Sequence, residues 1–333
     1  MSSAPADPAR VSLPLDGEGS RASRGIASLW LPILLFGLLA LVPLLAKLGA
    51  EGFIVSLLTR VVILGLAAMS LDLLIGFGGL ISFGHAAFLG IGAYAVGILS
   101  SHGHGDLLLQ LAVAVAASVA FALASGAIAL RTQGVYFIMI TLAFGQMLFF
   151  LATSLAAYGG DDGLTLPGRS TFLGRPVLRS DVVLYYVALG TLLAGYCLGR
   201  RLVGSRFGRV LRGARENEIR MEAVGFEPFR YRLLAYAIAG AVAGVAGVLM
   251  ANLSEFVSPA TMSWQRSGDL IFMAVLGGLG TLHGAVVGAA AFLLIEEVLS
   301  HVTEHWRILF GPLLILAVLF LRGGLVGKLG NRP

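Results

Sequence analysis

Few ionisable side chains interrupt the apolar stretches of this 333-residue sequence. A charge at the centre of a bilayer costs at least ~2.5 to 3.5 kcal/mol, so residues that keep one there commonly mark transport paths or proton relays. We expect water to reach Asp72 at the cytoplasmic end of its segment and Asp269 at the outer end of its own. An ion-coupled carrier usually has a deeper acid or a proton relay, which this sparse set does not provide. The full set is Asp72, His85, Asp269, His283, Glu296 and Glu297.

Each of the two histidines in this set follows a glycine-rich interruption of an apolar run, GFGGLISFGH at 76–85 and GGLGTLHG at 277–284. An interrupted helix leaves backbone N–H and C=O groups unpaired, which is tolerated at membrane depth only against protein or a water-filled cavity. Paired interruptions in the two halves of a membrane protein therefore indicate a translocation path. A neutral imidazole could bond the freed carbonyls, or it could contact cargo or a gate. The predicted path or gate residues are Gly76, Gly78, Gly79, Ser82, Gly84, His85, Gly277, Gly278, Gly280 and His283.

A long basic loop at 199–232 holds nine arginines and four glutamates. Phe207, Val210, Leu211 and Ala214 follow the i, i+3, i+4, i+7 spacing of one apolar helix face, and arginines cover the remainder. A second short helix is expected at 216–219, with Gly225 as the C′ residue that ends it. The alternative is a solvated loop that only sets topology.

The composition requires an integral membrane protein. Hydrophobic residues make up 57% of the chain and charged residues 12%, against about 25% charged in soluble domains, and the mean hydropathy is +0.90. With about 20 apolar residues per crossing, we predict an all-α polytopic fold of about ten transmembrane helices with two Gly-rich helix breaks. The expected spans are 29–47, 54–75, 84–100, 107–130, 134–157, 181–199, 232–252, 268–280, 284–300 and 306–322.

The positive-inside rule sets the orientation, because it places the arginine-rich loop in the cytoplasm. Counting spans in both directions from this loop puts the N-terminal and C-terminal basic residues on the same side. We therefore expect a disordered cytoplasmic tail at 1–28 and a transmembrane domain at 29–322. That domain includes the loop at 200–231, and a cytoplasmic tail follows at 323–333. Both interruptions then have the same orientation, so no inverted repeat is inferred.

Several functional classes are disfavoured. The basic residues share no soluble face and accompany no recognition motif, so we expect no nucleic-acid partner. The sequence has neither a GxxxxGK[ST] phosphate loop nor HExxH, and its single cysteine excludes a thiolate metal cluster. Uphill transport would need energy from another chain or from an ion gradient. Small-xxx-small spacings at Gly240, Gly244, Gly247, Gly284 and Gly288 predict close helix packing, which could include a partner permease.

Motifs in the right order along 60–327 resemble the permease subunits of branched-chain amino acid ABC importers, the LivM and LivH type. They are GFGGLISFGHAAFLGIGAY, RTQGVYFIMITLAFGQM, the SRFGRVLRGARENEIRMEAVGFEPFRYR loop, FVSP, VLGGLGTLHGAVVGA and LFLRGGLVG. The second block is more similar to the LivM branch.

The resemblance implies the ABC importer permease fold and a subunit without its own ATPase. Its implied partners are a second homologous permease, two cytoplasmic ATPases that carry ATP and Mg, an extracytoplasmic binding protein and membrane lipid. The chain itself would bind no cofactor or metal, and it would lie in a bacterial inner membrane with both termini cytoplasmic. Urea or short amides are the alternative cargo, and a self-sufficient secondary transporter or channel is the alternative class. The implied ATPase-coupling residues are Arg206, Arg209, Arg212, Arg215, Glu216, Asn217, Glu218, Glu222 and Gly225.

Overall fold

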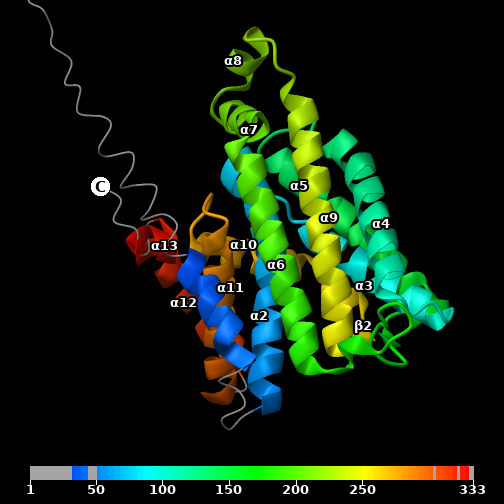
Figure 1. The fold of residues 1–333 in the computed structure, drawn as a ribbon. Coiled ribbons are helices and arrows are strands. Elements are labelled where there is room, and N and C mark those ends of the chain that lie inside the picture. The colour runs from blue at the N-terminus through cyan, green and yellow to red at the C-terminus, as the bar shows by residue number, and fades with distance from the viewer. Residues whose placement is uncertain (1–31, 44–50, 303–304, 321–322, 330–333) are drawn as a thin grey trace, which may run out of the picture.

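The computed structural model describes residues 32–43, 51–302, 305–320 and 323–329. Most of these residues are helical, and the longest helices run roughly side by side (Figure 1). Each long helix is apolar around most of its circumference, as is typical of helices that are buried or that face lipid.

Six described helices are long and apolar enough to cross a membrane. They are α2 (Glu51–Asp72), continued by the π-helix η1 (Leu73–Phe77), and α4 (Leu107–Ala129), α5 (Val135–Ser154), α6 (Asp181–Gly204), α9 (Pro228–Ser254) and α11 (His283–Val302). The shorter helices are Pro32–Pro43, α3 (His85–Ser101), α7 (Arg206–Glu216), α8 (Glu218–Ala223), α10 (Trp264–Gly277), α12 (Trp306–Phe320) and α13 (Gly324–Leu329), with the 3₁₀ turns η2 (Ala156–Tyr158), η3 (Val177–Arg179) and η4 (Pro259–Met262).

Local sequence explains several helix starts. The Asp106 side chain accepts a hydrogen bond from the Leu108 N–H at 3.2 Å and so caps α4, as short polar N-cap residues do. Ser263 caps α10 in the same way through the Arg266 N–H. Pro228 occupies the first turn of α9, where its missing N–H costs nothing.

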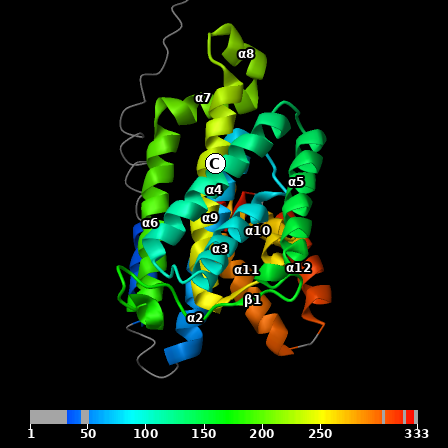
Figure 2. The same ribbon diagram turned by 90° about the vertical axis from the view of Figure 1, so that its right-hand side faces the viewer.

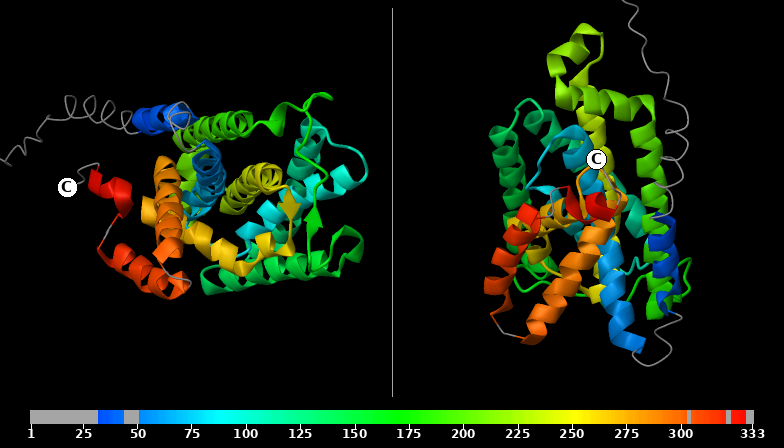
Figure 3. Two further views of the ribbon diagram at one scale, coloured as in Figure 1. Left: turned by 90° about the horizontal axis from the view of Figure 1, so that it is seen from below. Right: turned by 90° about the vertical axis from the view of Figure 1, so that its left-hand side faces the viewer.

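Helices α2 and α9 form the centre of the bundle. In their most apolar stretches 72% and 61% of the residues are buried, against 22–39% in the other four long helices. Helices α6, α10 and α11 pack against α2, and α3 and α4 pack against α9 (Figure 3).

Glycines let the central helices approach closely. A Cβ at Gly240 would lie 2.7 Å from the Phe88 ring, and one at Gly247 would overlap the Leu89 carbonyl oxygen of α3. Gly288 of α11 similarly faces the Met273 carbonyl of α10. The predicted packing role of these glycines is therefore confirmed.

The two ends of the bundle differ. Helices α7 and α8 project from one end (Figures 1 and 2). At the other end, β1 (Leu164–Thr165) pairs antiparallel with β2 (Phe256–Val257). Buried hydrogen bonds hold the segment between α5 and α6 in place at this end. Ser170 donates its backbone N–H to the Asn252 side-chain oxygen at 2.7 Å and its hydroxyl to the Gln110 side-chain oxygen at 2.5 Å.

The helices lie close to the predicted ranges, but the number of membrane crossings stays a prediction. Helix α10 begins four residues before the predicted span at 268–280 and ends at Gly277. The expected tail at 1–28 lies outside the described residues, as do parts of the first predicted span. Within the predicted C-terminal tail at 323–333, α13 packs through Gly324 against Gly278.

Candidate functional site

Asp72, the last residue of α2, binds the backbone of the second glycine-rich segment. Its Oδ1 accepts a hydrogen bond from the Gly280 N–H at 2.7 Å, and its Oδ2 accepts one from the Leu282 N–H at 3.1 Å. The side chain is completely buried, so the expectation that water reaches Asp72 is wrong. The non-helical backbone between α10 and α11 supplies unpaired N–H groups, and these replace water around the carboxylate.

The two glycine-rich segments touch each other directly. A Cβ at Gly76 would lie 2.6 Å from the Gly280 Cα and would also overlap the Asp72 carboxylate and the Gly280 nitrogen. Gly280 has φ +76°, a left-handed conformation that favours glycine. Two interruptions that are far apart in the sequence thus meet in one contact region, called here the glycine junction (residues 72–80 and 277–284).

Arg215 of α7 joins the basic loop to this junction. Its guanidinium Nη1 donates a hydrogen bond to the Gly76 carbonyl. A Cβ added at Gly79 would lie 2.9 Å from the Arg215 Cγ, and Gly79 has φ +69°. On the second segment, the Thr281 hydroxyl donates to the Gly278 carbonyl at 2.6 Å. Arginine and threonine therefore pair with the freed carbonyls.

The two histidines do not take that role and do not meet. His85 is completely buried, and its Nε2 lies 2.9 Å from the Ser70 hydroxyl, which itself donates to the Ala67 carbonyl. His283 packs edge-on against the Tyr196 ring at 6.4 Å between centroids. The expectation that an imidazole bonds the freed carbonyls is thus wrong for His85, whose partner is the Ser70 hydroxyl of α2.

Most of the predicted path residues are covered by the chain itself. Ser82 is completely buried, and a Cβ at Gly84 would overlap the Thr141 carbonyl of α5. Gly277 approaches the Gly284 carbonyl equally closely. Gly79 is exposed, Gly280 and His283 are half-buried, and the others are buried: Gly76, Gly78, Ser82, Gly84, His85, Gly277 and Gly278. Their part in translocation stays a prediction.

The basic loop folds as two helices. Val210, Leu211 and Ala214 are buried on one face of α7, which confirms the predicted apolar stripe. The second helix begins two residues later than predicted, because Glu216 is the last residue of α7 and Asn217 caps α8 by accepting a hydrogen bond from the Arg220 N–H at 2.9 Å.

The end of α8 matches the sequence prediction. Gly225 follows the C-cap Val224 with φ +88°, the left-handed C′ conformation that ends many helices.

Most of the predicted coupling residues are exposed, but several also bond within the chain. Glu218 points inward, where it accepts hydrogen bonds from Arg232 at 2.8 Å and Gln133 at 2.5 Å. Arg215 joins the glycine junction, and Arg212 bonds the Gly208 and Val203 carbonyls. Glu218 is half-buried. The other predicted residues are exposed: Arg206, Arg209, Arg212, Arg215, Glu216, Asn217, Glu222 and Gly225.

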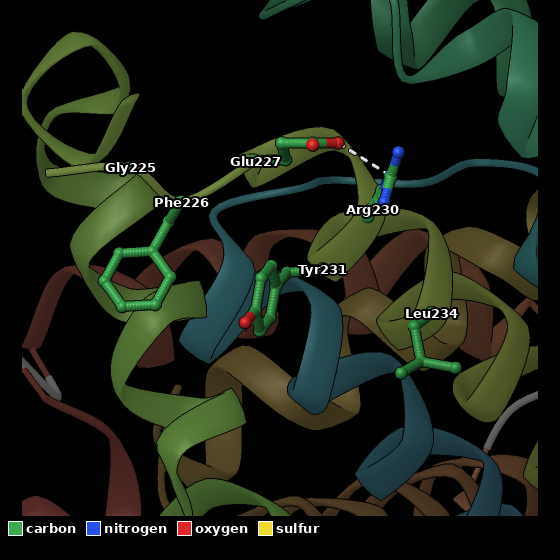
Figure 4. Close-up of a pocket in the computed structure, with 6 residues that line it drawn as sticks. All are labelled: Gly225, Phe226, Glu227, Arg230, Tyr231 and Leu234. Atoms are coloured by element: carbon green, nitrogen blue, oxygen red, sulfur yellow. Dashed lines mark ion pairs between the residues drawn. The ribbon is translucent and has the colours of Figure 1, made fainter. Parts of the chain in front are cut away.

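Two apolar side chains, one in α8 and one at its C-cap, are strongly exposed, and the sequence analysis did not select them. Ile219 is 78% exposed and Val224 is 68% exposed. An open pocket of about 470 Å³ lies where the chain turns from α8 into α9 (Figure 4). Its lining residues are Gly225, Phe226, Glu227, Arg230, Tyr231 and Leu234, and Glu227 pairs with Arg230 at 2.6 Å. Among the predicted residues, only Gly225 lines this pocket.

Comparisons with known proteins assign the family. The family described as "Branched-chain amino acid transport system / permease component" matches residues 53–318. The chain is 29% identical to the high-affinity branched-chain amino acid transport system permease protein LivM of Salmonella typhimurium, over 82% of the chain and 69% of that protein. It is 29% identical to LivM of Escherichia coli (strain K12), over 86% and 74%. It is 27% identical to the permease protein LivH of the same organism, over 79% and 91%.

No solved structure shows significant similarity to the chain. The family match covers most of the sequence, and the described structure adds six helices of membrane-spanning length. This chain is therefore a multi-pass membrane protein that belongs to the family of permease components of branched-chain amino acid transport systems.

Proposed function

We propose that the chain is one of two transmembrane subunits of an ABC importer that brings branched-chain amino acids into the cell. Both the LivM and LivH relatives carry that cargo in their names, and the sequence has no phosphate loop of its own. The observation that carries the proposal is the bond from Arg215 to the Gly76 carbonyl, because it connects a projecting cytoplasmic loop to the glycine junction inside the helix bundle.

The projecting loop is the docking surface for the ATPases. Exposed apolar residues on a projecting element are those that a protein partner covers, and Ile219 and Val224 fit this description. Arg209, Glu216 and Glu222 of α7 and α8 are also exposed and would set orientation more than affinity. The ATP and Mg of the transport cycle belong to the two partner ATPases.

Movement of α7 is transmitted to both glycine-rich segments. Arg215 holds the first segment at Gly76, and Asp72 holds the second at Gly280 and Leu282. Interrupted helices absorb φ/ψ changes more readily than continuous ones. Closure of the ATPases would therefore shift the two segments together and open the path alternately to the two sides of the membrane.

The remaining assignments follow from this arrangement. The segments 76–84 and 277–284 lie at membrane depth and border a path that is completed by the second permease subunit. The end of the molecule with α7 and α8 is cytoplasmic, as are both chain termini, and the membrane is the bacterial inner membrane. The opposite end, with the β1–β2 pair, receives the extracytoplasmic binding protein.

Reconstitution tests the proposal. Proteoliposomes that contain this chain, a second family permease and two ATPases should take up leucine only with ATP on the ATPase side and binding protein on the other. The chain alone should give no flux with or without an ion gradient. Leucine flux through the chain alone would identify a self-sufficient carrier or channel and would contradict the proposal.

A further inference from the structure

A tight turn at residues 172–175 displays an apolar side chain at the end of the bundle away from α7 and α8 (Figure 1). The Phe172 N–H donates to the Arg175 carbonyl at 2.8 Å, and the Arg175 N–H donates to the Phe172 carbonyl at 3.0 Å. The two central residues have positive φ, +50° at Leu173 and +77° at Gly174, as in a type I′ hairpin turn. Leu173 is 69% exposed, and a Cβ added at Gly174 would meet no atom within 4 Å. The tip of the turn therefore projects away from the rest of the described chain.

Leucine is an unusual residue at the first central position of such a turn. Type I′ turns prefer Asn-Gly or Asp-Gly, because the left-handed conformation is unfavourable for most residues with a side chain. Leu173 adopts this conformation and also exposes an apolar side chain to solvent, and neither feature stabilises the chain on its own. Residues held in sparsely populated backbone conformations cluster at functional sites. A contact with a partner would account for both features of Leu173.

The segment that carries the turn is held in a fixed position. The Thr171 N–H donates to the carbonyl of Gly105, just before the N-cap of α4, at 2.7 Å. Arg169 pairs with Asp181, the first residue of α6, at 2.6 Å and with Glu255, the C-cap of α9, at 3.1 Å. The turn thus lies beyond the ends of three long helices and outside their apolar spans.

We propose that the turn 172–175 is a surface on which the extracytoplasmic binding protein docks, an assignment that rests on the proposed import function. Leu173 is the apolar anchor, and Phe172, which is 40% exposed, extends its apolar surface. Arg175 lies directly opposite Phe172 in the turn, so the two side chains share one face. Among the described residues the Arg175 side chain forms no ion pair, and a carboxylate of the binding protein provides its partner.

The composition of the turn suits a protein partner. Aromatic residues and arginine are enriched in protein interfaces, and Phe172 and Arg175 stand beside the exposed Leu173. The fixed backbone lowers the entropy lost on binding, because the turn is already ordered. The import function places a soluble partner at this end of the molecule. Through Arg169, that partner would be seated on a segment that is joined to the end of α9.

The test measures ATP hydrolysis by the complete transporter in nanodiscs, at increasing concentrations of the leucine-loaded binding protein that supports wild-type uptake. Leu173→Asn introduces a polar residue that suits positive φ, so the turn should be at least as stable as in wild type. The variant should raise the concentration of binding protein that gives half-maximal hydrolysis by about tenfold or more. Its basal and maximal rates should match wild type. Leu173→Met keeps an apolar side chain and should leave the half-maximal concentration near the wild-type value.

The charge of Arg175 is tested in the same assay. Arg175→Gln should raise the half-maximal concentration at low salt, and the difference from wild type should shrink at high salt, because exposed charges are screened. A difference that is independent of salt would exclude the carboxylate partner.

Three results would overturn the docking surface. They are an unchanged half-maximal concentration in Leu173→Asn, an equal rise in Leu173→Met, and a loss of basal hydrolysis or of thermal stability in Leu173→Asn. A rise in nanodiscs that is absent in detergent would assign the turn to lipid headgroups instead. A wild-type complex that imports no leucine with any binding protein would contradict the import function itself, which separates the two failures.

Discussion

The Asp72 carboxylate and the Gly280 N–H lie 2.7 Å apart although 208 residues separate them in the sequence. This bond fastens the end of α2 to the turn between α10 and α11, and Leu282 adds a second bond at 3.1 Å. Asp72 thus supports the glycine junction.

Removal of this carboxylate should destabilise the protein. Asp72→Ala leaves two buried N–H groups unpaired, at about 1 to 3 kcal/mol each, whereas Asp72→Asn keeps one acceptor oxygen and should cost less. Thermal unfolding of the purified permease complex checks the order wild type, Asn, Ala. Equal stability of Asp72→Ala and wild type would contradict the supporting role.

Neighbouring glycines of the first segment should tolerate substitution very differently. Gly76→Ala would place its Cβ 2.6 Å from the Gly280 Cα, while a Cβ at Gly78 would meet only the Leu211 and Leu80 side chains at 3.6 Å. Overpacking typically costs about 1 to 3 kcal/mol. We expect Gly76→Ala to abolish leucine uptake and Gly78→Ala to retain it, at equal membrane levels. Similar uptake by both variants would show that the close approach is dispensable.

The Glu218–Arg232 pair should anchor α8 to α9. The Arg232 side chain is 9% exposed and the Glu218 side chain is 25% exposed. Glu218→Gln leaves the nearly buried Arg232 cation without its carboxylate partner, so it should lower the free energy of unfolding by about 3 kcal/mol or less. Adding Arg232→Met removes that cation and should recover part of the loss. A double-mutant cycle on thermal stability measures the coupling, and strictly additive losses would exclude it.

The exposed apolar side chains of α8 should bind the ATPases. Ile219→Asp places a charge where the partner would cover an apolar residue. It should lower the amount of ATPase that co-purifies with the permease, while the amount of permease in the membrane stays at the wild-type level. Val177→Asp is the matched control, because Val177 is 43% exposed in η3, which precedes the end of α6 that lies away from α7. An equal yield of ATPase with Ile219→Asp would argue against docking at α8.

Local patterns predicted the elements better than their contacts. The spacing of Val210, Leu211 and Ala214 identified the buried face of α7, and Gly225 marked the end of α8. Such signals depend on neighbours within one or two turns, so the sequence carries them directly.

Contacts between distant segments were not predictable in the same way. The direction of Arg215 and Glu218 depends on the packing of α7 and α8 against η1 and α9, which periodicity does not report. Asp72 was expected near water because of its place in the span. A helix interruption needs acceptors for its N–H groups, which is the one signal that would have pointed to a buried carboxylate.

The bond from Arg215 to the Gly76 carbonyl is tested most directly by the number of leucine molecules transported per ATP hydrolysed in proteoliposomes. Arg215→Gln should lower this ratio strongly while the ATPases remain bound, because α7 would move without the glycine junction. Arg209→Gln, an exposed neighbour on the same helix, should keep the wild-type ratio. An unchanged ratio in Arg215→Gln would contradict transmission through this contact.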